Sequence, residues 1–161
     1  MLARVRVIAD YQFGPGAGAG LFPDECRFIL SQTGRVRQVL LGESRIATLR
    51  AGDGRLTLSH AGACRLREAL PPPAYRVVID PSVEEFIPNA KTAFAKHVLS
   101  ADPGIRAGDE VLIVTGGDDI LATGMAILSG AEMLSFNYGP AVKIREGRES
   151  GCSQERSTPG K

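Results

Sequence analysis

The stretch that decides the fold runs from residue 75 to residue 146. It opens with Tyr75-Arg76-Val77-Val78-Ile79-Asp80 and closes with Gly139-Pro140-Ala141-Val142-Lys143-Ile144-Arg145 followed by Glu146. A row of β-branched residues followed by Asp-Pro predicts a strand and its end. Residues 111–114 and 120–128 predict two further strands, joined by a hairpin loop at 116–119. Several short strands separated by turns are typical of a small barrel or sandwich.

Two details refine this prediction. Val83, Phe86 and Ile87 have helical spacing, so a short helix is expected before Pro88. Gly124 interrupts the strand run 120–128, which indicates a bend or a close approach of another backbone segment.

The segments along this stretch resemble those of a PUA domain, the family named after pseudouridine synthases and archaeosine transglycosylases. The resemblance covers residues 75–147 and is carried by Pro-Asn-Ala-Lys-Thr-Ala-Phe-Ala-Lys-His-Val (88–98), Asp-Pro-Gly-Ile-Arg-Ala-Gly-Asp-Glu-Val (102–111), Leu-Ala-Thr-Gly-Met-Ala (121–126) and Gly-Pro-Ala-Val-Lys-Ile-Arg (139–145). It implies a β pseudo-barrel that binds structured RNA.

Residues 1–70 predict a separate, smaller unit. Alternating residues over 2–9 indicate a strand, and the glycine-rich run 14–20 is expected to be a mobile connection. A meander follows, with strands over 27–31, 35–41, 44–50 and 55–58, and Gly52-Asp53-Gly54 makes a tight turn. A helix begins at Ser59 or His60 and ends before Pro71-Pro72-Pro73, a stiff linker. The expected result is an antiparallel sheet with one face covered by a helix.

This first part resembles the module that precedes the PUA domain in archaeosine tRNA-guanine transglycosylases. Residues 9–14, 31–37 and 47–54 carry the resemblance. In that family a TIM barrel with the catalytic aspartates and a zinc site comes first, and this sequence contains neither a barrel-sized segment nor a zinc motif. The resemblance therefore implies tRNA binding without base exchange, in the service of a catalytic subunit encoded separately.

The expected fold class is α+β, with a small antiparallel sheet and helix followed by a PUA-like β pseudo-barrel. The predicted boundaries are a domain over 1–70, a proline linker over 71–74, a PUA domain over 75–147 and a tail over 148–161. Residues 147–161 contain no aliphatic or aromatic side chain, and the tail is expected to be disordered because it cannot bury enough apolar surface.

Composition excludes few functions. The 161 residues carry a formal charge of +1, but residues 1–70 hold ten arginines against six acids, whereas 75–147 hold six basic residues against ten acids. No apolar run is long enough to span a membrane, and the start lacks a signal-peptide pattern. Three scattered cysteines fit a reducing compartment, so the expected location is the cytoplasm, with no metal and no cofactor.

Arginine supplies the first candidate binding residues. Arg35 and Arg37 share a strand face, and Arg50 and Arg55 flank the Gly-Asp-Gly turn. Arginine binds phosphates bidentately, so a group of arginines on one sheet face would hold a nucleic-acid backbone, and an ordinary solvated face is the alternative.

The PUA resemblance supplies the second group, in the loop after the first helix, the strand that follows and the last strand. By position these residues are Asn89, Ala90, Lys91, Thr92, Lys96, His97, Lys143 and Arg145. Loop amides and lysines can bind phosphates, and His97 or Phe94 can stack on an unpaired base, although both could equally pack in the core.

Two other classes of function stay open. A small RNA-modifying enzyme would need an acid–base pair, but the adjacent carboxylates Asp109-Glu110 and Asp118-Asp119 point to opposite faces of a strand or lie in turns, so no catalytic residue is assigned. A protein-interaction module with a repurposed PUA surface is the other alternative, favoured by the negative balance over 75–147.

Overall fold

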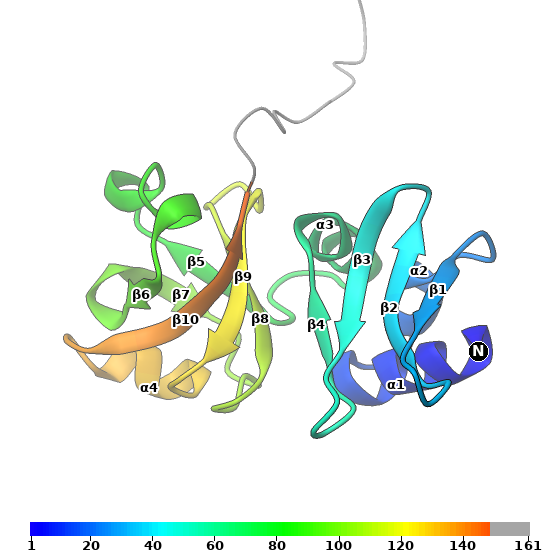
Figure 1. The fold of residues 1–161 in the computed structure, drawn as a ribbon. Helices are drawn as coiled ribbons and strands as arrows, with labels where there is room; N and C mark the ends of the chain where they lie inside the picture. Colours follow the sequence, from blue (N-terminus) through cyan, green and yellow to red (C-terminus); the bar gives the residue numbers. More distant parts are fainter. Residues whose placement is uncertain (149–161) are drawn as a thin grey trace, which may run out of the picture.

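The computed structural model describes residues 1–148 and contains a four-stranded and a six-stranded sheet, each accompanied by helices (Figure 1). The α+β class and the small sheet followed by a curled pseudo-barrel are confirmed. In chain order the elements are α1 (Leu2–Phe13), α2 (Ala17–Leu21), β1 (Arg27–Leu30), β2 (Val36–Leu41), β3 (Ser44–Leu49), β4 (Leu56–Leu58), α3 (His60–Ala69), β5 (Arg76–Ile79), η1 (Pro81–Val83), η2 (Ile87–Asn89), β6 (Thr92–Phe94), η3 (Ala95–His97), β7 (Val98–Ala101), β8 (Glu110–Val114), β9 (Ile120–Ala126), α4 (Gly130–Ser135) and β10 (Pro140–Gly147).

The chain begins with a helix, so the strand predicted over residues 2–9 is wrong. Val5, Ala9 and Phe13 are spaced four residues apart and are the buried residues of α1. The alternating pattern included Val7, which in the structure is 66% exposed. Residues 2–9 fit both the two-residue period of a strand and the 3.6-residue period of a helix, and the residues that are buried follow the helix period.

The glycine-rich run is also ordered, contrary to the expectation of a mobile connection. Its second half forms α2, in which Ala17, Gly18 and Leu21 are buried. A Cβ at Gly18 would lie 2.3 Å from the backbone oxygen of Arg6, so α1 and α2 pack backbone to backbone. The Asp10 carboxylate accepts a hydrogen bond from the Gly18 amide (2.8 Å) and fixes this contact.

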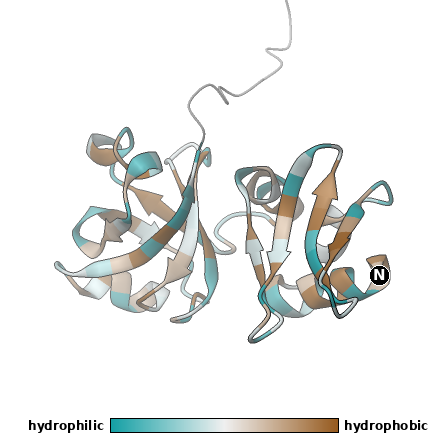
Figure 2. Cartoon of the chain, in the orientation of Figure 1, coloured by the Kyte–Doolittle hydropathy of each residue, from teal (hydrophilic) through white to brown (hydrophobic). Residues whose placement is uncertain are grey.

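The meander predicted over 27–58 is confirmed as the four-stranded antiparallel sheet β1-β2-β3-β4. The helix predicted to follow is α3, whose N-cap Ser59 accepts a hydrogen bond from the Gly62 amide (3.1 Å). Strand β1 lies at the edge of this sheet and is largely hydrophobic (Figure 2), yet Ile29 and Leu30 stay 44% and 42% exposed.

The second sheet has the strand order β6-β10-β9-β8-β5-β7, antiparallel except for the pair β5 and β8. The short turn η3 joins β6 directly to β7, the two outermost strands, and so curls the sheet towards a barrel. A Cβ at Gly124 would lie 2.2 Å from the Lys143 backbone oxygen, which confirms the close approach expected there.

Two features of this half differ from the sequence prediction. The helical pattern over 83–87 forms two single 3₁₀ turns, η1 and η2, instead of one helix. Helix α4 was missed, although Ser129 and Glu132 form a complete capping box at its start. Of the tail predicted over 148–161, residues 149–161 lie outside the described residues.

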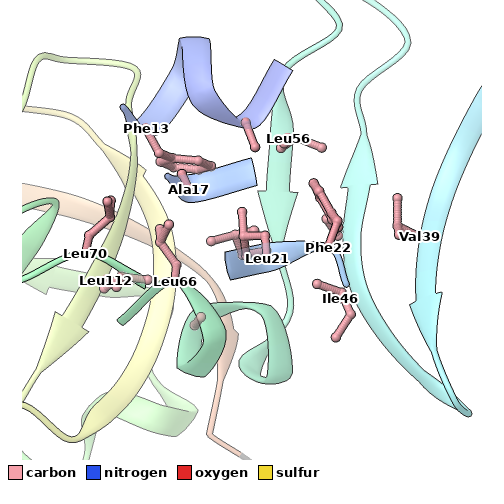
Figure 3. Packing of buried hydrophobic residues seen from close by; sticks show 14 of the residues in the cluster. Phe13, Ala17, Leu21, Phe22, Val39, Ile46, Leu56, Leu66, Leu70 and Leu112 are labelled. Atoms are coloured by element: carbon pink, nitrogen blue, oxygen red, sulfur yellow. The ribbon is translucent and has the colours of Figure 1, made fainter. Parts of the chain in front are cut away.

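One apolar cluster connects the two sheets. It contains Leu66 and Leu70 of the first part together with Leu112, Val114 and Ile120 from β8 and β9. Figure 3 shows Leu112 beside Leu66 and Leu70 at the edge of the cluster built around Phe13, Leu21 and Phe22. The two parts therefore share core packing. Within residues 1–148 no helix has the length and apolar character needed to cross a bilayer.

Candidate nucleic-acid interface

A basic pocket lies on the first sheet, between α1 and two hairpins. It has a volume of about 520 Å³, and its polar lining consists of four arginines and two hydroxyl residues: Arg4, Arg35, Arg37, Arg50, Ser31 and Thr33. Three of the four arginines predicted from the sequence, Arg35, Arg37 and Arg50, therefore meet in one place. Arg4 was missed because residues 2–9 were assigned to a strand.

A β-bulge helps to aim the arginines. Leu30 pairs with Val36 and Ile29 with Gln38, which leaves Arg37 as the extra residue of β2. An extra residue breaks the alternation of side chains along a strand, so Arg37 reaches the pocket although the nearby Val39 faces the core. Gly34, at φ +77°, makes the turn that brings Arg35 to the same pocket.

The charges of this pocket are mostly uncompensated. The Arg50 guanidinium lies 3.5 Å from the Asp53 carboxylate, both groups being half-exposed. Within residues 1–148 no ion pair joins Arg4, Arg35 or Arg37 to an acidic group. A hollow with three free guanidiniums attracts anions, and phosphate oxygens match their geometry.

The PUA-type residues form a second basic area in the other half of the molecule. Thr92 of β6 lies directly opposite Lys143 of β10, and the Ile144 amide donates to the Lys91 carbonyl (2.9 Å). The side chains of Asn89, Lys91 and Lys143 are exposed, whereas Ala90 and Thr92 are half-buried. The loop and the last strand, which the resemblance named together, thus lie side by side.

The remaining PUA-type residues occupy the seam where the barrel closes. Lys96 is exposed and His97 is half-buried in η3, and the His97 carbonyl accepts a hydrogen bond from the Asp80 amide (2.9 Å). Phe94 points largely outward, at 44% exposure, so it is not the core residue that the sequence left open.

Arg55 and Arg145 join the two halves of the chain instead of pointing freely into solvent. Arg55 donates to the Gly108 carbonyl (3.1 Å) and lies 3.6 Å from the Asp109 carboxylate. Arg145 forms a two-point pair with the Glu110 carboxylate and also donates to the Leu58 carbonyl (2.8 Å). Their roles as RNA contacts stay predictions, and both guanidiniums already have protein partners.

Glu110 is the centre of this joint. Its side chain is only 4% exposed, and its second oxygen accepts the Leu58 amide (2.6 Å) as well as Arg145. Burial raises the pKa of Glu110 above its ordinary value, against the lowering effect of Arg145 and the Leu58 amide. The sequence placed the Asp109-Glu110 and Asp118-Asp119 carboxylates in solvated turns; Glu110 is buried, and Asp118 binds the buried Arg76 (2.8 Å).

An aromatic pair was not anticipated from the sequence. Phe136 and Tyr138 follow α4, and their rings stack with centroids 6.4 Å apart. Tyr138 is 80% exposed. An exposed ring beside a basic strand can stack on an unpaired nucleobase. The signal was present in the sequence as Phe-Asn-Tyr just before Gly139, a turn residue.

No group of three potential metal ligands exists among residues 1–148. Among residues 1–148 Cys26 and Cys64 form no disulfide; both side chains are half-buried, and burial raises the pKa of Cys26. The Cys64 thiol lies 3.6 Å from Nε2 of His60 on the same helix, and no third potential ligand completes a metal site there among the described residues.

The two halves match two known domain families. Residues 3–73 match the patch-forming domain C2 of tRNA-guanine transglycosylase, and residues 75–148 match the PUA domain. The chain therefore combines a segment similar to the transglycosylase C2 domain with a segment similar to the PUA domain, and each match covers a little under half of the 161 residues.

Its particular likeness is to the C-terminal part of archaeal tRNA-guanine(15) transglycosylases, without their catalytic barrel. It is 48% identical over 147 residues to the protein of Methanothermobacter thermautotrophicus and 50% identical over 147 residues to that of Pyrococcus abyssi. These alignments cover 91% of this chain but only 22% and 25% of the relatives, so the chain spans about a quarter of their length.

Solved structures share the fold. A hypothetical protein from Pyrococcus horikoshii superposes with a TM-score of 0.72 at 21% identity, covering 91% of this chain and 89% of that one. A conserved PUA domain protein from Thermoplasma acidophilum gives a TM-score of 0.63 at 22% identity, covering 90% and 91%.

Proposed function

We propose that this chain binds structured RNA, and tRNA in particular, for a transglycosylase-type catalytic barrel that lies outside its 161 residues. The observation that carries the proposal is the pocket in which Arg4, Arg35 and Arg37 meet without an acidic partner among residues 1–148. The likeness to tRNA-guanine(15) transglycosylases supports tRNA as the RNA.

In this proposal the two basic areas contact different parts of the RNA. The arginine pocket supplies charge-assisted contacts to phosphates, and the loop at Asn89 and Lys91 with the neighbouring Lys143 supplies a second grip. Tyr138 adds a stacking surface for a base that is not paired. Phosphate contacts position an RNA, whereas contacts to unpaired bases and the 2′-hydroxyl distinguish one RNA from another.

Filter binding of tRNA across a range of salt tests the proposal. Each phosphate contact releases counterions, so log affinity falls linearly with log salt, and removing one contact reduces the slope by about 1. We expect Arg37→Gln to reduce the slope. Arg106→Gln is the matched control, since Arg106 is exposed and forms no ion pair within residues 1–148. Absence of tRNA binding at low salt would refute the proposal.

The role is non-catalytic in this proposal. The purified chain alone is expected to leave guanine in tRNA unexchanged, as measured with labelled guanine, because the proposal assigns it no catalytic residue and residues 1–148 hold no group of three potential metal ligands. Turnover by the chain alone would favour the enzyme alternative. Co-purification from native extract tests whether the barrel is a separate polypeptide. Cell fractionation tests the proposed cytoplasmic location.

A further inference from the structure

We propose that the arginine pocket is a site for a phosphate monoester at the 5′ end of an RNA, distinct from a surface that follows internal phosphodiesters. The inference rests on the proposed RNA-binding function and assigns a ligand class to one of its two basic areas. It starts from the shape of the site, because the arginines surround a hollow and do not form a ridge.

The hollow is enclosed from three directions. Arg4 comes from α1, Arg35 and Arg37 from the hairpin between β1 and β2, and Arg50 from the hairpin between β3 and β4. Its volume of about 520 Å³ falls in the range of small-molecule sites, about 300 to 1,000 Å³. A chain end can enter such a hollow, whereas the phosphates of a continuous duplex lie on a broad convex surface.

The charge of the pocket fits a dianion better than a diester. Arg50 is partly neutralised by Asp53, at 3.5 Å, which leaves the guanidiniums of Arg4, Arg35 and Arg37. An internal phosphodiester carries one negative charge, whereas a terminal monoester has a second pKa of about 6 and carries about −1.5 to −2 at pH 7. It also offers three oxygens to donors, and arginine binds such oxygens bidentately.

The pocket also provides hydroxyl groups. The Ser31 and Thr33 hydroxyls are hydrogen-bonded to each other at its wall (3.0 Å), so one of them donates to the other and the second can donate to a further phosphate oxygen. Arginine stays protonated throughout the pH range of the test, so a pH dependence of the monoester preference would come from the ligand itself. Asp53, which lies 3.5 Å from Arg50, is the acidic side chain paired with an arginine of the pocket.

The test compares two forms of one tRNA acceptor-stem hairpin, carrying either a 5′-phosphate or a 5′-hydroxyl. We expect the 5′-phosphate form to bind on the order of tenfold more tightly at pH 7.5, the effect of one or two charge-assisted bonds. The ratio should fall near pH 5, where the monoester has lost most of its second charge, but it should stay above one because the first charge remains. Guanosine monophosphate should compete for the same site, whereas guanosine should not.

Variants separate this site from general RNA binding. Arg37→Gln and, independently, Arg35→Gln should bring the ratio close to one while salt-dependent binding of the 5′-hydroxyl form persists; Arg106→Gln should keep the full ratio. Equal binding of the two forms by the natural chain, with a normal salt slope, would overturn the end-site inference and leave the proposed function intact. Binding of neither form at low salt would overturn both.

Discussion

Replacing Glu110 by alanine should destabilise the protein strongly. The carboxylate is 4% exposed and holds the Arg145 guanidinium in a two-point pair while also accepting the Leu58 amide. Removing one partner of a buried pair costs about 3 to 5 kcal/mol, because the other charge is left without compensation. The Arg145 side chain is 34% exposed and can turn to water, which places the expected loss near the lower end, about 3 kcal/mol.

Thermal and urea unfolding followed by circular dichroism measure this loss. For a chain of this size each kcal/mol lowers the melting temperature by about 2 to 4 °C, so Glu110→Ala should melt about 6 to 12 °C below the natural protein. Glu85→Ala is the matched control: Glu85 is exposed, and its loss should stay within about 0.5 kcal/mol. If Glu110→Ala also stays within that range, the reasoning that the joint between the two sheets depends on this carboxylate is refuted.

Three further outcomes are expected. In Arg145→Ala the Glu110 carboxyl keeps the burial that raises its pKa and loses the cation that lowers it. A folded pKa above the unfolded one means that the folded state binds more protons, so the free energy of unfolding should fall as pH rises from about 4.5 through the folded pKa. Urea unfolding across pH should show a steeper fall than in the natural chain. Gly18→Ala should cost about 1 to 3 kcal/mol because its Cβ would meet the backbone of α1 at 2.3 Å, whereas Gly52→Ala, with nothing within 4 Å, should not; equal melting temperatures would contradict the close helix packing. Burial raises the pKa of Cys26, so iodoacetamide should modify it several-fold more slowly in the folded than in the urea-unfolded chain, measured by peptide mass spectrometry; equal rates would contradict its burial.

Much of the fold could be predicted because local signals agreed with one another. The meander over 27–58 was readable from its turns, and Ser59 marked the start of α3 as its cap. The order of strands over 75–146 carried the PUA resemblance. The first helix failed for a physical reason: residues 2–9 satisfied a strand period and a helix period at once, and only packing of Val5 against the core resolved them.

The candidate site could be predicted only in part. Arg35, Arg37 and Arg50 were identified as a group, but Arg4 reaches the pocket from an element that sequence reasoning had assigned to a strand. Arg145 was carried over by position in the family, and nothing in its local sequence shows that Glu110, on another strand, engages it. Long-range ion pairs depend on which strands become neighbours, and adjacency of that kind is absent from a single sequence.

The core shared by the two sheets has a consequence for how a polynucleotide would be held. Leu112, Val114 and Ile120 pack against the first half, and the Glu110 joint braces the same boundary, so the arginine pocket and the Asn89 loop sit at a fixed separation. A bound RNA would therefore need two contact points separated by that same distance. The protein would then lose little conformational entropy on binding. An RNA whose two contact points are spaced differently would bind more weakly, without any contact to its bases.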